Sequence, residues 1–244
     1  MDIGSAFSFV FEDEQWIGKL VIGALIGLIP IFGQLALIGY SIAIIRSVQA
    51  GAPRLPRWEN LGQYFVDGLM ASIAKWIYAI PFWIFLCPIM LVWVLPALGG
   101  EQEELVSILA GISGLVSVAL GCLALLYGLL LLVVSPAVQI RYAERGELGA
   151  CLDFREVVRF AFDNVGHILV VQLVVWVVGG LVSGILSGVV SVLGMIPICG
   201  WVVGGFLALL AFPMMTWLVA FYSHLYGQIG RSAPARPPAR PPTI

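Results

Sequence analysis

Five long apolar stretches dominate this sequence, at residues 16–50, 68–98, 105–140, 165–198 and 200–228. A helix that crosses the hydrocarbon core of a bilayer needs about 20 apolar residues, at about 1.5 Å of rise each. Only 11% of the residues are charged and 61% are hydrophobic, so a water-soluble fold of 244 residues would lack the polar groups to cover its surface. We therefore expect an all-α integral membrane protein.

A proline and a glycine three positions apart interrupt the apolar sequence twice. Pro30 and Gly33 divide the first stretch, and Pro197 and Gly200 stand in the same arrangement late in the chain. Proline ends a helix and glycine permits a tight reversal, so each pair predicts a helical hairpin. With the two central stretches, this gives a helical bundle of about six spans in three consecutive hairpins. Whether segments 16–50 and 165–228 cross fully or are partly re-entrant stays open.

Amphipathic segments introduce the hairpins. Similar short sequences, rich in aromatic residues and ending in aspartate, occur at residues 9–13, 64–67 and 160–163. In 153–163 the charged and apolar residues separate onto two helical faces, which is typical of a helix lying on the membrane surface. We expect an interfacial amphipathic segment at 1–15, a transmembrane domain at 16–228 and a disordered tail rich in proline and arginine at 229–244.

Basic residues lie on one side of the predicted spans. They occupy the two long loops and the tail: Arg54, Arg57, Arg145, Arg155, Arg159, Arg231, Arg236 and Arg240. The opposite side has two nearly uncharged turns and an acidic one at 99–104. Because basic loops stay in the cytoplasm, the sequence predicts a multi-pass protein of the cell membrane with both termini cytoplasmic.

Four ionisable residues are candidates for function because charge inside a membrane domain is costly. Asp67 and Lys75 are eight residues apart and share a helical face, and His167 follows Asp163 by one turn. All four fall near the expected cytoplasmic boundary. Helix capping with interface anchoring is one interpretation, and a proton or ion relay is the other.

Arg46 and Arg141 stand near the ends of apolar stretches, each five residues before a glycine. A guanidinium matches the oxygens of a lipid phosphate, so anionic head groups are possible ligands. The simpler interpretation is that both side chains extend from a helix end to the membrane surface.

Small residues recur every fourth position between 180 and 191. Gly180, Gly184 and Gly188 form one stripe. Small residues at this spacing let helix backbones approach closely in lipid, so we interpret the stripe as a helix-packing face, with a pore lining as the alternative.

Catalytic and metal-binding patterns are missing from the sequence. It lacks HExxH, GxSxG and P-loop motifs, and its cysteines form no CxxC pair. We interpret Cys87, Cys122, Cys151 and Cys199 as free packing thiols. No catalytic residue, cofactor, metal site or nucleic-acid partner is expected.

A set of short motifs in the first quarter of the chain resembles a known family. The motifs are FEDEQW at 11–16, LIPIFG at 28–33, GY at 39–40, Arg46, Gly51 and LPRW at 55–58. With them the chain resembles the bacterial and archaeal membrane proteins grouped as domain of unknown function 4013 (DUF4013). The likeness extends over most of the chain before the tail and is most specific from Asp13 to Asp67. It implies a polytopic membrane fold, and no substrate, cofactor or catalytic residue.

The sequence is compatible with two main functions. The first is a non-enzymatic scaffold or accessory module that packs against the lipid bilayer, other membrane proteins or a second copy of itself. The alternative is a small permease or lipid-handling protein, suggested by the repeated hairpins and by the interior prolines Pro81, Pro88, Pro136 and Pro213. An enzyme ranks third, because the deep spans hold too few ionisable groups.

Overall fold

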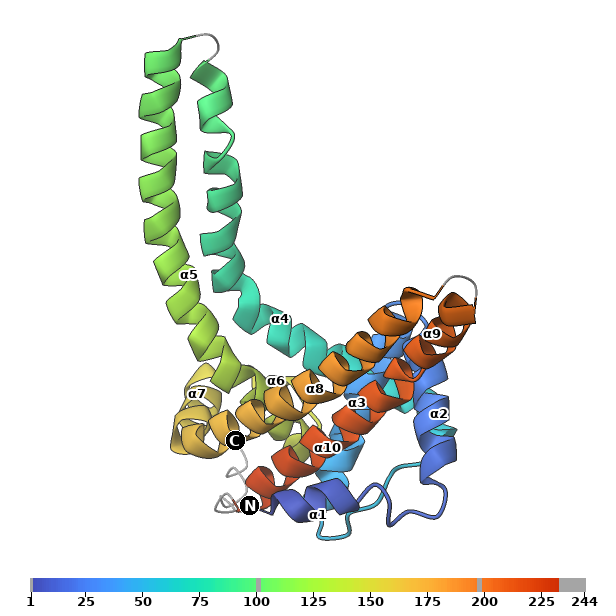
Figure 1. Cartoon of the computed structure of the whole chain (residues 1–244). Coiled ribbons are helices and arrows are strands. Elements are labelled where there is room, and N and C mark those ends of the chain that lie inside the picture. The colour runs from blue at the N-terminus through green and yellow to red at the C-terminus, as the bar shows by residue number, and fades with distance from the viewer. Residues whose placement is uncertain (1, 100–101, 197–198, 233–244) are drawn as a thin grey trace, which may run out of the picture.

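The protein is all-α over residues 2–99, 102–196 and 199–232, the part described by a computed structural model (Figure 1). The expected all-α class is thus confirmed. The elements in chain order are α1 (Ile3–Ser8), α2 (Trp16–Gly27), α3 (Phe32–Gln49), the short 3-10 helix η1 (Trp58–Asn60), α4 (Leu61–Val92), a second 3-10 helix η2 (Leu95–Gly99), α5 (Glu103–Arg145), α6 (Leu148–Cys151), α7 (Phe154–Asp163), α8 (Val165–Gly194), α9 (Cys199–Leu209) and α10 (Ala211–Ser232).

Four helical segments are long and apolar enough to cross a membrane: Trp58–Ala97, Glu103–Arg145, Val165–Gly194 and Gly200–Ser232. They indicate a multi-pass membrane protein, and the described residues contain four such segments where about six spans were expected. The first hairpin is too short, because α2 has 12 residues, or about 18 Å of helix, against a hydrocarbon core of about 30 Å. Sequence composition could not reveal this, since the short helix is as apolar as the long ones.

At both turns predicted from proline and glycine, the glycine has the same close neighbour. A Cβ on Gly33 would lie 1.9 Å from the carbonyl oxygen of Ile26, and one on Gly200 would lie 1.8 Å from that of Leu193. In both turns the glycine therefore presses against a carbonyl seven residues earlier, where a side chain has no room. Pro197 lies outside the described residues.

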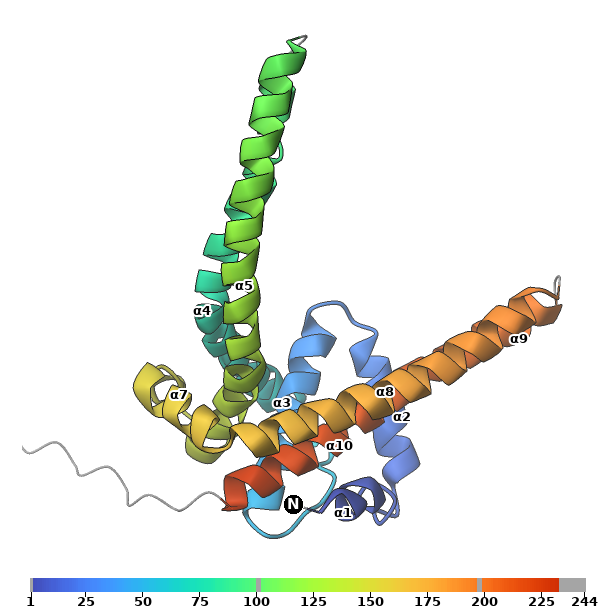
Figure 2. The ribbon, with the colours of Figure 1, turned by 60° about the vertical axis from the view of Figure 1, so that its left-hand side comes forward.

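The two long hairpins diverge from a shared base (Figures 1 and 2). We call α4 with α5 the central arm and α8 with α9 the C-terminal arm. The base consists of α1, α2, α3, α6, α7 and the ends of α5 and α10 that meet them. The expected bundle is therefore confined to the base, and large apolar side chains such as Leu115 and Trp176 are exposed along the arms.

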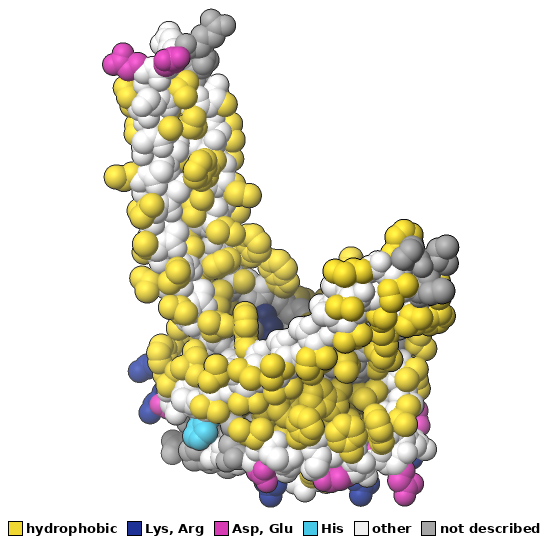
Figure 3. Space-filling model, viewed as in Figure 1, with side chains coloured by type: hydrophobic (Ala, Val, Ile, Leu, Met, Phe, Trp, Pro, Cys, Tyr) yellow, Lys and Arg dark blue, Asp and Glu magenta, His cyan; other side chains and the backbone are white. Residues whose placement is uncertain are grey.

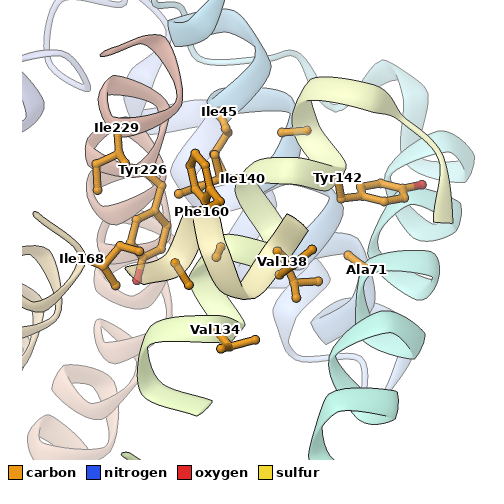
Figure 4. Close-up of a cluster of buried hydrophobic side chains, with 14 of the residues drawn as sticks. Ile45, Ala71, Val134, Val138, Ile140, Tyr142, Phe160, Ile168, Tyr226 and Ile229 are labelled. Carbon is orange, nitrogen blue, oxygen red and sulfur yellow. The ribbon is translucent and has the colours of Figure 1, made fainter. Parts of the chain in front are cut away.

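The buried core lies in the base, where six helices meet. Figure 4 shows side chains from α3, α4, α5, α7, α8 and α10 pointing toward one another. The labelled members are Ile45, Ala71, Val134, Val138, Ile140, Tyr142, Phe160, Ile168, Tyr226 and Ile229. This core fixes the helix ends that carry the polar groups described below.

Helices α3 and α4 cross with their backbones in direct contact. A Cβ on Gly39 would lie 1.7 Å from the carbonyl oxygen of Tyr64, and one on Gly68 would lie 1.8 Å from that of Leu35. Glycine on both helices allows this approach, which is shorter than any side chain permits. The crossing sets the angle at which the central arm leaves the base.

The N-terminus and the end of α10 lie at the same end of the molecule. The Asp2 backbone N–H donates to Gln228 Oε1 at 2.7 Å, and Gln228 Nε2 donates to the Asp2 carbonyl at 2.9 Å. The 1–15 segment thus packs on α10 through α1. Because α10 continues to Ser232, residues 229–232 are helical and the tail cannot begin at 229 as expected; positions 233–244 lie outside the described residues.

Candidate functional site

Three helices bring an ion pair and its partners together in the base. Arg46 Nη1 on α3 lies 2.6 Å from Asp67 Oδ2 on α4, and Arg46 Nε donates to the Ala143 carbonyl at 3.2 Å. Gln63 Nε2 and the Tyr142 hydroxyl donate to the other carboxylate oxygen, at 3.1 and 3.2 Å. The side chain of Asp67 is 5% exposed and that of Arg46 is 35% exposed. Both carboxylate oxygens are therefore satisfied inside the protein.

Neither candidate aspartate caps a helix. Asp67 lies well inside α4, which begins at Leu61, and Asp163 is the last residue of α7. Asp163 instead faces Arg159, with Nε and Oδ2 3.9 Å apart and both side chains more than 60% exposed. The caps belong to Asp153, which accepts from the Glu156 N–H at 3.1 Å, and to Asp2 at the start of α1.

Lys75 takes part in a second polar group, which we call the polar triad: Ser41, Lys75 and Gln139. Lys75 Nζ donates to Gln139 Oε1 at 2.9 Å, and Gln139 Nε2 donates to the Ser41 hydroxyl. Ser41 and Gln139 are buried, whereas Lys75 is partly exposed. Among the described residues, no carboxylate lies within ion-pair distance of Lys75.

Sequence reasoning missed Ser41 and Gln139. It placed Lys75 at the membrane boundary on the face it shares with Asp67, and the structure does direct both side chains to α5, where they contact Gln139 and Tyr142. A signal was available in Gln139, an amide inside the apolar stretch 105–140. Such a side chain needs a partner in lipid or in a bundle.

Arg141 on α5 forms an ion pair with Glu156 on α7. Its Nη1 lies 2.7 Å from Glu144 and its Nη2 lies 2.6 Å from Glu156, which Arg145 also contacts at 2.7 Å. The Arg141 guanidinium also lies over the Phe160 ring, 4.8 Å from its centroid. The structure thus places Arg141, like Arg46, in contacts within the protein.

His167 lies at the edge of the base, one turn into α8. It lines an open groove of about 540 Å³ with Asn164, Gln228, Arg231 and neighbouring residues of α10. Asp163 interacts with Arg159 and not with His167.

The small-residue stripe faces open space. A Cβ added at Gly180, Gly184 or Gly188 would meet nothing within 4 Å. The contact between α8 and α9 lies elsewhere, where Gly204 faces Val190 at 3.7 Å. Packing of the stripe therefore stays a prediction that concerns another molecule.

Residues of the FEDEQW, GY and LPRW motifs lie together at one side of the base. Lys19 Nζ lies 2.5 Å from Asp13 Oδ2 and donates to the Leu55 carbonyl at 2.8 Å. The Trp58 indole donates to the Lys19 carbonyl at 2.8 Å and stacks on Tyr40, with ring centroids 4.1 Å apart. Burial favours a higher pKa for Asp13, but its hydrogen bonds from Lys19 and from the Gln15 N–H outweigh it and lower the pKa.

Metal-binding groups of three or more His, Cys, Asp or Glu residues are absent from the described ranges. Cys87 and Cys122 are exposed and Cys151 is buried, and all three are free thiols. Burial raises the pKa of Cys151 to about 11, which keeps its thiol protonated and unreactive at neutral pH.

Comparison with known proteins supports the family likeness and adds no activity. Residues 22–196 match the family described as Protein of unknown function (DUF4013). No curated protein matches the chain, and no solved structure does.

Proposed function

The chain belongs to the DUF4013 family of proteins of unknown function, and we propose that it serves there as a non-enzymatic membrane scaffold or accessory module. In this proposal its arms pack against lipid or against other membrane helices. The observation that carries it is the open small-residue stripe on α8, where Gly180, Gly184 and Gly188 have free space above them. A partner helix that packs on this stripe gains close backbone contact, which is a main source of association energy in lipid.

Cross-linking in native membranes tests the scaffold proposal. In a background without the native cysteines, Gly184→Cys is expected to cross-link to a partner helix, since a side chain there points into open space. Gly204→Cys is the matched control on α9, because that position faces Val190 within the arm at 3.7 Å. A protein that runs as a lone species in mild detergent, with no cross-link from Gly184→Cys, would remove the support for a scaffold.

We further propose that the base faces the cytoplasm. Figure 3 shows basic side chains at the base, with acidic ones among them, and acidic side chains at the far tip of the central arm. The acidic residues at the start of α5 are Glu103 and Glu104. This distribution matches the positive-inside rule, since lysine and arginine are retained on the cytoplasmic side.

Labelling of single cysteines tests this orientation. In a cysteine-free background, Arg155→Cys is expected to react with an impermeant maleimide only in inside-out vesicles, and Glu104→Cys only in right-side-out vesicles. Both positions are exposed, so reagent access depends on the side of the membrane. Reaction of Arg57→Cys and Arg155→Cys from opposite sides would contradict a base that lies on one face.

Lipid handling is the second candidate, and one observation favours it. Lys75 is the single basic residue of α4, and its ammonium has a neutral amide as its partner among the described residues. A charge in a membrane domain without a counter-ion is costly and commonly marks a ligand site.

A further inference from the structure

We infer that Lys75 binds the phosphate of an anionic membrane lipid, whose acyl chains lie in the gap between the central and C-terminal arms. This inference rests on the lipid-handling candidate and names its ligand class and its binding residue. Ser41 and Gln139 position the ammonium, and the phosphate neutralises it.

Lys75 differs from Lys19 and Arg46 in having a neutral partner instead of a carboxylate. Lys19 has Asp13 at 2.5 Å and Arg46 has Asp67 at 2.6 Å, so these cations are neutralised inside the protein. Lys75 donates one hydrogen bond, to Gln139 Oε1 at 2.9 Å, within the described part of the chain. An ammonium has three donors, so two remain for the oxygens of a phosphate.

The polar triad lies on the base side of the point where the two arms separate. Gln172 Nε2 on α8 donates to the Leu132 carbonyl on α5 at 3.4 Å, and beyond these residues the arms diverge (Figure 2). Gln139 is two helical turns from Leu132 toward the base, or about 10 Å. Figure 3 shows a basic side chain in the floor of the gap, apart from those gathered at the base.

Exposed tryptophans support a position of this floor near the lipid head groups. From Gln172 to Gly194, α8 is about 33 Å long, and it runs obliquely to the central arm (Figure 2). Trp76 and Trp176 stand near the floor with 61% and 73% of their surfaces exposed, as expected for tryptophans at a membrane interface. A head group at the triad would therefore direct its acyl chains along the exposed apolar faces of both arms.

Native mass spectrometry of the full chain in mild detergent tests the inference. Phosphatidylglycerol and phosphatidylcholine with the same acyl chains are added separately, and the retained lipid is counted. Wild-type protein is expected to prefer phosphatidylglycerol by about tenfold, because its phosphate charge is not offset, whereas the choline ammonium of phosphatidylcholine neutralises the phosphate and repels Lys75. Lys75→Met and Lys75→Gln are expected to lose this preference, and Lys75→Arg to keep it.

Two controls separate the possible results. Arg155→Gln removes an exposed charge of the base and is expected to leave the preference unchanged, which excludes a general surface effect. Inorganic phosphate is added alone and in competition: displacement of the lipid by it at equal concentration would overturn the assignment to a lipid.

The outcomes also distinguish the inference from the candidate on which it rests. A preference for phosphatidylglycerol that survives Lys75→Met and Lys75→Gln would overturn the Lys75 site while leaving lipid handling in place. Equal retention of both lipids by the wild-type protein would overturn the assignment to an anionic lipid, and retention of neither lipid would remove lipid handling itself. Thermal unfolding of each variant shows whether a loss of binding reflects loss of the fold.

Discussion

Replacing Gly39 with alanine is expected to disrupt folding of the base, whereas the same replacement at Gly184 is expected to leave the fold intact. The new methyl group at position 39 would lie 1.7 Å from the carbonyl oxygen of Tyr64, so two helix backbones must move apart. Overpacking against side chains costs about 1–3 kcal/mol, and we expect at least about 3 kcal/mol here because a backbone cannot change rotamer. Thermal unfolding in detergent and the monodisperse fraction on size exclusion measure the effect.

Gly184→Ala is the matched control, since it makes the same change in another apolar helix where nothing lies within 4 Å. Alanine has the higher helix propensity, so Gly184→Ala is expected to leave the melting temperature equal or slightly raised. Gly68→Ala is expected to behave like Gly39→Ala, because its methyl group would lie 1.8 Å from the Leu35 carbonyl oxygen. Equal melting temperatures for Gly39→Ala and Gly184→Ala would contradict the close crossing.

Arg46→Gln is expected to destabilise the protein by about 3 kcal/mol, the lower end of the range for breaking a buried ion pair. The change leaves the Asp67 carboxylate, which is 5% exposed, with Gln63 and Tyr142 as its remaining donors. The lower end applies because Arg46 itself is 35% exposed. Chemical unfolding in mixed micelles gives the difference in free energy.

The double variant Arg46→Gln with Asp67→Asn separates charge burial from loss of packing. It removes both charges, so it is expected to be more stable than Arg46→Gln alone. Arg159→Gln is the control at an exposed pair, where we expect a loss below about 0.5 kcal/mol. If the double variant loses as much as the two single variants together, Arg46 and Asp67 are not energetically coupled.

The hairpin turns were predictable from the sequence because proline and glycine act locally. Pro30 and Gly33 mark a reversal whose geometry depends on a few neighbouring residues, and the late turn at Gly200 repeats it. The number of spans was not predictable in the same way. Apolar side chains cover lipid-facing and buried surfaces alike, so composition did not distinguish the short α2 from a full span, nor diverging arms from a bundle.

The candidate site was predictable in its residues and not in its contacts. Asp67 and Lys75 stood out as charges inside an apolar stretch, and their spacing gave their common face. Their partners come from other helices: Arg46 is 21 residues from Asp67, and Gln139 is 64 residues from Lys75. Helical spacing carries no information about which helices become neighbours. The tertiary contacts were therefore needed to show that Asp67 and Asp163 do not cap helices.

The arms are joined at one end only, and this has a mechanical consequence. The common support of both arms is the glycine crossing of α3 and α4 together with the core in Figure 4. The arms meet near the base and diverge from there, so the angle between them can change without breaking contacts along their length.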